Sequence, residues 1–169
     1  MEKNVTLIGM PGAGKSTIGV VLAKILGYKF LDSDLLIQAQ EGRLLWQIIK
    51  REGIEGFLKI EEQVNSGIVA DNTIIATGGS VIYGSKAMAH LREISAVVYL
   101  RLSYEKIETR LGNLEKRGVT LPEGWTLCDL YNERTPLYEK YAHITFDCGN
   151  EDIRETAVSL AALLQKSTI

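Results

Sequence analysis

Short apolar runs of strand length alternate along this chain with longer segments in which apolar residues recur at helical spacing. Residues with β-branched or aromatic side chains are frequent in the short runs, as in strands that are buried on both faces. The predicted strands are residues 5–9, 29–32, 73–77, 96–102 and 144–147. The predicted helices are residues 15–26, 35–40, 44–51, 54–69, 85–93, 104–110, 127–141 and 152–165.

This alternation predicts the fold class. Strands that alternate with helices favour an α/β protein with a parallel sheet and helices on both faces of that sheet. The chain has 169 residues and no internal repeat or linker, so we expect a single domain over residues 1–169. Ligands of such sheets bind beyond the carboxyl ends of the strands, where we therefore expect the functional residues.

Composition narrows the classes of partner. With 46% hydrophobic and 24% charged residues, the chain resembles an ordinary globular protein. A net charge of −2 gives no reason to expect nucleic acid or a membrane surface as a partner. No segment resembles a signal peptide or a membrane span. Cys128 and Cys148 lack metal-ligand spacing, which favours a cytoplasmic protein with two thiols.

Residues 9–17 carry the strongest motif, GMPGAGKST, which fits the phosphate-binding P-loop pattern G-x-x-x-x-G-K-S. A predicted strand precedes it and a predicted helix follows, which is the context that this motif needs. Its glycines let backbone N–H groups turn toward an anion, and the helix N-terminus adds a positive dipole end. Lys15 can reach the β- and γ-phosphates, and the Ser16 hydroxyl can ligate Mg²⁺. A glycine-rich turn without a ligand would need neither residue.

Polar residues follow two other predicted strands. Asp32 and Asp34 leave the second strand, where one carboxylate can hold water on Mg²⁺ and the other can face an acceptor hydroxyl. The alternative is a solvated turn in which Asp34 caps the next helix. Gly78 and Gly79 follow the third strand and allow a ligand to approach the backbone closely, although a tight strand exit would also use them.

The order of these motifs resembles the shikimate kinase family. The resemblance rests on the P-loop, the sequence FLDSD at 30–34, a G…F…E pattern at 53–61, ATGG at 76–79 and ERTPLY at 133–138. It spans residues 4–147. It implies a three-layer sandwich with a five-stranded parallel sheet of the nucleoside monophosphate kinase type. It also implies ATP-dependent phosphorylation of a hydroxyl on a small polyol or hydroxy acid, with shikimate as the default acceptor.

For the nucleotide side, the resemblance implies ATP and Mg²⁺ as cofactors. Arg110 matches the arginine that packs on adenine in the family. Arg117 matches the arginine of a mobile lid, here about residues 112–129, which approaches the phosphates when the lid closes. The phosphates and the metal would be held by Gly12, Ala13, Gly14, Lys15, Ser16 and Thr17.

For the acceptor side, the resemblance implies a helical region at about residues 34–69 that binds a small molecule. Asp32 would reach the metal, and Asp34 would bind the acceptor hydroxyls and help to remove a proton. Gly78 and Gly79 would lie against the acceptor. The arginine that pairs with the acceptor carboxylate matches Arg134. We expect a monomer.

Several positions depart from the family. Leu58 stands where the family has a second arginine for the carboxylate, and Lys59 lies about 100° further around the helix. A lost charge-assisted contact costs about 1.5–3 kcal/mol of binding free energy. Glu61 would then lack its usual positive neighbour. Ser80 replaces a third glycine, and Trp125 stands in a divergent lid, either as an anchor or as a residue that closes over a ligand.

Three alternatives therefore remain open. The first is the same chemistry on another acceptor, such as a sugar acid or a neutral polyol. The second is a nucleotide-binding regulatory module without transfer activity, although such a module would not need the acceptor-side residues. The third is a nucleoside monophosphate kinase, which Asp32, Asp34 and the short acceptor region disfavour.

Overall fold

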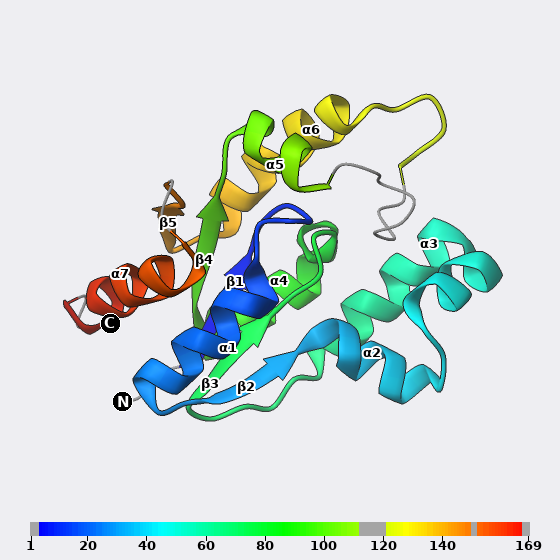
Figure 1. Ribbon diagram of the computed structural model, residues 1–169. Helices are drawn as coiled ribbons and strands as arrows, with labels where there is room; N and C mark the ends of the chain where they lie inside the picture. Colours follow the sequence, from blue (N-terminus) through cyan, green and yellow to red (C-terminus); the bar gives the residue numbers. More distant parts are fainter. Residues whose placement is uncertain (1–3, 112–120, 150–151, 167–169) are drawn as a thin grey trace.

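The structure, a computed structural model, describes residues 4–111, 121–149 and 152–166 (Figure 1). Five parallel strands form one sheet in the order β2-β3-β1-β4-β5. The predicted five-stranded parallel sheet is thereby confirmed. The strands are β1 (Asn4–Ile8), β2 (Lys29–Asp32), β3 (Thr73–Ala76), β4 (Ser95–Arg101) and β5 (Ile144–Asp147).

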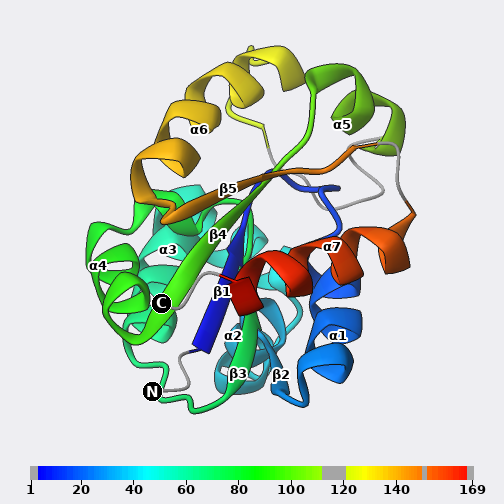
Figure 2. The same cartoon turned by 90° about the vertical axis from the view of Figure 1, so that its left-hand side faces the viewer.

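Helices cover both faces of the sheet. Helices α1 and α7 lie on one side, and α3 and α4 lie on the other (Figure 2). The two layers of helices and the sheet between them make the predicted three-layer sandwich. The helices are α1 (Lys15–Leu26), α2 (Ser33–Glu41), α3 (Leu45–Ser66), α4 (Ser85–Ile94), α5 (Tyr104–Leu111), α6 (Leu127–Tyr141) and α7 (Ile153–Lys166), with a short 3₁₀ helix η1 (Val81–Tyr83).

The central strands are buried because both of their faces are covered. Leu7 is fully buried and pairs with Ala76 on one side and Val98 on the other. Polar residues among the strands have partners: the Thr6 and Ser95 hydroxyls lie 2.7 Å apart, and Ser95 also lies 2.6 Å from the Leu91 carbonyl oxygen. All five strands run in the same direction, so their carboxyl ends meet at one edge of the sheet.

The region of α2 and α3 has an apolar cluster of its own, formed by Ile37, Ile48, Phe57 and Val64. The sequence predicts two helices here, with a break near Gly53. The structure confirms the break: α3 consists of two helical segments that meet at Gly53, which adopts the non-helical values φ 71° and ψ 177°. This conformation is accessible to glycine and strained for other residues, so the glycine permits the sharp turn. In Figure 1, α2 and α3 project away from the sheet on the right-hand side of the view.

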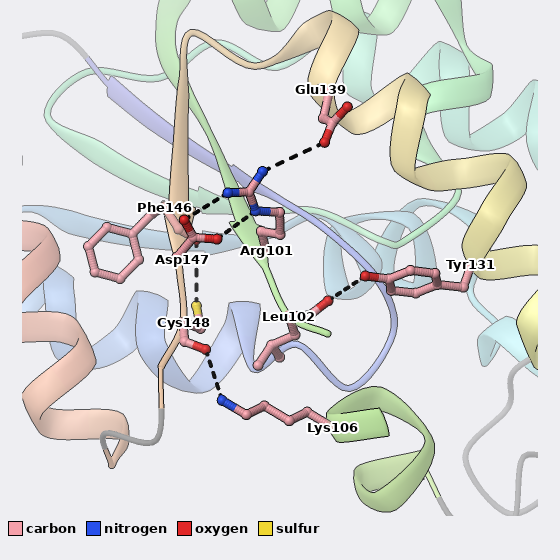
Figure 3. Close-up of polar contacts among 8 residues, drawn as sticks. All are labelled: Arg101, Leu102, Lys106, Tyr131, Glu139, Phe146, Asp147 and Cys148. Atoms are coloured by element: carbon pink, nitrogen blue, oxygen red, sulfur yellow. Dashed lines mark hydrogen bonds and ion pairs between the residues drawn. The ribbon is translucent and has the colours of Figure 1, made fainter. Parts of the chain in front are cut away.

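At the far edge of the sheet, polar contacts fasten β4 and β5 to the neighbouring helices (Figure 3). Arg101 Nε donates to Asp147 Oδ1 at 2.5 Å, and its Nη1 lies 3.8 Å from Glu139 Oε1 on α6. The Lys106 ammonium on α5 donates to the Gly149 carbonyl at 2.8 Å. The Lys106 contact holds the segment that follows β5 against α5. Within the described part of the chain, no helix combines the length and apolarity that a membrane span requires.

Candidate active site

The loop between β1 and α1 has the shape of an anion cradle. Gly12 and Gly14 have φ values of 80° and 90°, which glycine adopts without the strain that a side chain would bring. Gly14 is the N-cap of α1, and it has no side chain that could cap the first N–H groups of the helix. The first N–H groups of an α-helix have no partners within the helix, and together with the dipole they attract a negative charge.

Lys15 crosses this loop instead of extending into solvent. Its ammonium donates to the Gly9 and Met10 carbonyl oxygens, each at 2.8 Å, and its side chain is buried. Burial lowers the pKa of Lys15 to about 8, partly offset by the nearby Asp34 carboxylate. The Lys15 ammonium is therefore held largely out of water, at a position where a bound phosphate group could pair with its charge.

Asp32 joins the loop to the second strand. Its Oδ2 accepts a hydrogen bond from the Ser16 hydroxyl at 2.6 Å, and its Oδ1 accepts from the backbone N–H groups of Asp34 and Leu35 at 3.0 and 3.4 Å. Asp32 is therefore the N-cap of α2, which begins at Ser33. The alternative in which Asp34 caps a helix from Leu35 is wrong, because the helix already begins at Ser33 and Asp34 lies within its first turn.

The Asp34 carboxylate lies on the cavity wall close to Gly78. A Cβ atom on Gly78 would lie 2.8 Å from Asp34 Oδ1 and 2.7 Å from Glu61 Oε1. Burial raises the pKa of Asp34 to about 6, with a further rise from Asp32 and an opposing effect from Lys15. Burial likewise raises the pKa of Glu61 to about 7, opposed by the hydrogen bond from Ser80. Two carboxyl groups with displaced pKa values thus share one wall of a cavity, as in many acid–base sites.

Arg134 supplies a buried cation next to Gly79. Its guanidinium carbon lies 5.3 Å from the centre of the Tyr83 ring, and its Nε donates to the Tyr83 hydroxyl at 3.3 Å. Among the described residues, no carboxylate lies within ion-pair distance of this guanidinium. The Gly79 carbonyl is fixed by the Tyr138 hydroxyl at 2.6 Å, and a Cβ on Gly79 would meet Arg134 Nη1 at 3.0 Å.

One cavity of about 680 Å³ at the carboxyl edge of the sheet is lined by the P-loop, Asp34, Glu61 and Arg134. Leu58 lines it as one of several apolar residues on α3, whereas Lys59 is exposed and contributes nothing to the lining. Trp125 also lines it and packs against the main core, so it is both anchored and in position to contact a ligand. The apolar residues that α3 contributes are Leu45, Ile49, Ile54, Phe57 and Leu58.

A second cavity, of about 470 Å³, lies on the other side of the P-loop. Arg110 lines it and directs its Nη1 to the Gly12 and Ala13 carbonyl oxygens at 3.3 and 3.4 Å. Gly149, which Lys106 fastens to α5, forms another part of its wall, together with Ile153 at the start of α7. The two cavities share Gly12 and Gly14 of the loop.

Comparison with known proteins shows to which family the chain belongs. The family model for shikimate kinase matches residues 11–165. The chain belongs to the shikimate kinase family. Members of this family are kinases that use ATP to phosphorylate shikimate.

Individual relatives agree with this assignment. The chain is 36% identical to the shikimate kinase of Nitrosospira multiformis over 168 residues, which cover 98% of this chain and 86% of that protein. It is 37% identical to the shikimate kinase of Nitrosomonas europaea, covering 97% of this chain and 79% of that protein. The structure of the Acinetobacter baumannii shikimate kinase in complex with shikimate superposes with a TM-score of 0.88, at 31% identity, covering 99% and 95% of the two chains.

In this member of the shikimate kinase family, nearly all the site residues predicted from the sequence lie at the carboxyl edge of the sheet. The lining of the larger cavity includes Gly12, Gly14, Lys15, Ser16, Thr17, Asp34, Gly78, Gly79 and Arg134. Asp32 lies behind Ser16, Arg110 lines the second cavity, and Ala13 is buried within the loop. Arg117 lies outside the described residues, as do positions 112–120 of the expected lid.

Two features of the site could not be predicted from the sequence because they depend on tertiary contacts: the position of Tyr83 and the contact between Ser80 and Glu61. Tyr83 lines the cavity from η1, and its hydroxyl donates to Glu133 Oε2 at 2.5 Å. Nothing in the local sequence marks Tyr83, because its partners lie about fifty residues further along the chain. The contact between Ser80 and Glu61 was also missed, although the departure from glycine at position 80 was a visible signal.

Proposed function

We propose that this protein transfers the γ-phosphoryl group of ATP to a hydroxyl group of shikimate. One observation carries this proposal: a donor set and an acceptor set line the same cavity. Lys15 and Ser16 belong to the donor set, and Asp34, Gly79 and Arg134 belong to the acceptor set. A nucleotide on the P-loop would thus direct its terminal phosphate into the space where a small acceptor fits.

The P-loop can hold the phosphates of the nucleotide, and the second cavity beside it can hold the nucleoside. Its phosphates would lie on the backbone N–H groups that follow Gly12, with Lys15 moving from the carbonyls of Gly9 and Met10 to the phosphate oxygens. The second cavity is open to the nucleoside, where Arg110 would stack on the base. Positive charge on the equatorial oxygens stabilises the loose transition state of phosphoryl transfer.

Ser16 and Asp32 fit a magnesium ion. Their oxygens lie 2.6 Å apart next to the loop, and Mg²⁺ prefers oxygen ligands with few from the protein and the rest from phosphates and water. Ser16 would bind the ion directly and Asp32 through water. When bound, the ion neutralises charge on the β- and γ-phosphates.

Asp34 would orient the acceptor and take its proton. In the reaction, the acceptor oxygen bonds to the γ-phosphorus, the bond to the β-phosphate oxygen breaks, and the hydroxyl proton passes to the Asp34 carboxylate. Arg134 would bind the carboxylate of shikimate, because its guanidinium is buried beside the cavity and no carboxylate among the described residues neutralises it.

We further propose that Arg117 contacts the transferred phosphate from a lid at about residues 112–129, since water competes with the acceptor unless the site closes. Residues 34–69 would form the region that binds the acceptor, in a single-domain monomer. The apolar cluster within α2 and α3 supports this division, because it lets the two helices pack as a unit.

A coupled assay of ADP release over a panel of hydroxylated acids and polyols tests the proposed function. We expect saturable turnover of shikimate with a KM of about 1 μM to 1 mM. The apolar wall at Leu58 supports a second candidate, the same chemistry on a less acidic polyol. Activity on such an acceptor without activity on shikimate would favour it. Nucleotide binding without turnover on any acceptor would favour a regulatory module.

A further inference from the structure

The second cavity lies between three parts of the fold that are distant in the sequence. The P-loop and α1 form one wall, α5 forms another, and the residues after β5 form the third together with the start of α7. Arg110 lies on the α5 wall, and Gly149 lies on the third wall. The separation of these walls therefore depends on how α5 is held against its two neighbours.

Two cations on α5 connect this helix to the other two walls. Lys106 and Arg110 are four residues apart, so their side chains project from the same side of the helix. Arg110 Nη1 reaches the P-loop, where it lies 3.3 Å from the Gly12 carbonyl oxygen and 3.4 Å from the Ala13 carbonyl oxygen. Lys106, one turn earlier, reaches the third wall.

Lys106 holds the third wall through two consecutive backbone carbonyls. Its ammonium donates to the Gly149 carbonyl oxygen at 2.8 Å and to the Cys148 carbonyl oxygen at 3.5 Å, and the second contact is drawn in Figure 3. Among the residues that the structure describes, no carboxylate lies within ion-pair distance of this ammonium. The charge of Lys106 is therefore directed to the backbone, and a hydrogen bond from a charged donor is stronger than one between neutral groups.

The third wall has few other supports. β5 is an edge strand of four residues that pairs with β4 on one side only. Arg101 holds its end, because the side chain binds Asp147 and the carbonyl oxygen accepts from the Cys148 N–H at 2.9 Å. Gly149 comes next, and a Cβ atom there would meet no neighbour within 4 Å. Within the described chain, the Lys106 hydrogen bond is thus what fixes Gly149.

We propose that Lys106 is a positioning residue for the nucleoside of the donor nucleotide. The proposal rests on the proposed function, which places the nucleoside in the second cavity. A base that stacks on Arg110 needs an opposite wall at a fixed separation, and Lys106 ties that wall to the helix that carries Arg110. Lys106 does not itself line the cavity. It acts by keeping the wall in place before the nucleotide arrives, so binding does not include the cost of ordering the wall.

Two ligands separate the nucleoside part of the site from the phosphate part. ADP occupies both parts, whereas inorganic tripolyphosphate can use only the P-loop. In calorimetric titrations with Mg²⁺ present, Lys106→Met should raise the Kd of ADP about threefold to tenfold, as expected when one segment must be ordered on binding. The Kd of tripolyphosphate should not change. Lys106→Arg keeps a charged donor and should retain most of the affinity for ADP.

Steady-state kinetics add a second measurement. Lys106→Met should raise the KM for ATP by a similar factor, with kcat and the KM of the acceptor unchanged. A general loosening of the fold would change all three values. Lys86→Met makes the same substitution at an exposed position of α4 and should bind both ligands as the wild type does. If thermal unfolding shows that Lys106→Met does not fold, Lys106→Gln takes its place in the same comparison.

ADP binding needs no acceptor, so the test is independent of the acceptor's identity. Equal affinity for ADP in the wild type and Lys106→Met would overturn the proposal, while shikimate turnover by the wild type left the proposed function intact. Equal weakening of ADP and tripolyphosphate would also overturn it, because Lys106 would then act as a distant charge or on the whole fold. A wild type that does not bind ADP would overturn both proposals.

Discussion

The Ser16 hydroxyl, in the first turn of α1, donates a 2.6 Å hydrogen bond to Asp32 Oδ2 at the end of β2, sixteen positions further along the chain. Asp32 uses its other oxygen to cap α2, so one carboxylate both starts a helix and faces the P-loop. The position of the acceptor residue Asp34, in the first turn of α2, is consequently tied to the position of the phosphate-binding loop.

This double role allows the metal-binding function of Asp32 to be separated from its structural one. Asparagine caps helices about as well as aspartate, but it is a weaker partner for Mg²⁺. We expect Asp32→Asn to raise the Mg²⁺ concentration for half-maximal activity about tenfold, with little change in Tm. Titration of activity with Mg²⁺ and thermal unfolding measure the two effects. An unchanged requirement for Mg²⁺ would contradict the role of Asp32, and exposed Asp71→Asn is the control.

Gly78→Ala should damage the acceptor half of the site alone. The new methyl group would lie 2.7 Å from Glu61 Oε1 and 2.8 Å from Asp34 Oδ1, so one or both carboxyl groups must move. Overpacking of this kind costs about 1–3 kcal/mol. If the acceptor complex bears that cost, kcat/KM for the acceptor falls by about fivefold to 150-fold.

Nucleotide binding provides the comparison for this variant. The affinity for ADP should stay the same in Gly78→Ala, because the P-loop is untouched. Gly67→Ala is a suitable control, since its Cβ would meet neighbours only at 3.7 Å and its φ is −97°. Normal turnover of the acceptor by Gly78→Ala would show that the close packing of the two carboxyl groups against Gly78 does not matter for the acceptor.

The local parts of the fold could be predicted from the sequence, whereas contacts between distant residues could not. The strands could be predicted because strands buried on both faces need runs of apolar residues. The P-loop could be predicted because phosphate binding needs glycines, a lysine and a hydroxyl at fixed spacing. The hydrogen bond between Ser80 and Glu61 spans 19 residues, and that between Arg134 and Tyr83 spans 51. Their geometry depends on how α3, η1 and α6 pack, which no local pattern encodes.

Asp34→Asn should stabilise the protein without ligand at neutral pH. The pKa of Asp34 is about 6 in the folded state against 3.8 for the unperturbed group, so between these values the folded state holds a proton that the unfolded state has lost. Stability from this group therefore falls as pH rises from about 4 to 6, and the full cost persists above that. Removing the charge should recover up to about 3 kcal/mol at pH 7.5.

The pH dependence makes this prediction specific. The difference in Tm between Asp34→Asn and the wild type should be several degrees at pH 7.5 and should shrink toward pH 4.5. Asp129→Asn should behave oppositely, because hydrogen bonds from the backbone and side chain of Thr126 lower the pKa of Asp129. A constant difference for Asp34→Asn across this range would show that the buried charge is not its cause.

Leu58→Arg should improve the binding of an anionic acceptor. Leu58 is half-buried on the cavity wall, so a guanidinium there would face the acceptor. A new charge-assisted hydrogen bond is worth about 1.5–3 kcal/mol, or roughly a tenfold to hundredfold lower KM for shikimate. The KM for a neutral polyol should not fall. Lys59→Arg, at an exposed neighbouring position, should change neither value, and an equal gain for both acceptors would contradict the prediction.

Lys15→Met should abolish phosphoryl transfer while preserving the fold. Methionine matches the lysine stem in length and apolarity, but it removes the only charge that the P-loop itself contributes to the phosphates. Loss of one preorganised group that stabilises transition-state charge costs about 10²–10³-fold in kcat, and Lys15 is expected to lie at or beyond the upper end. Lys24→Met makes the same change at the exposed end of α1 and should retain full activity. Single-turnover measurements of ADP formation distinguish lost chemistry from lost nucleotide affinity, and substantial transfer by Lys15→Met at saturating ATP would refute the assignment of the donor half of the site.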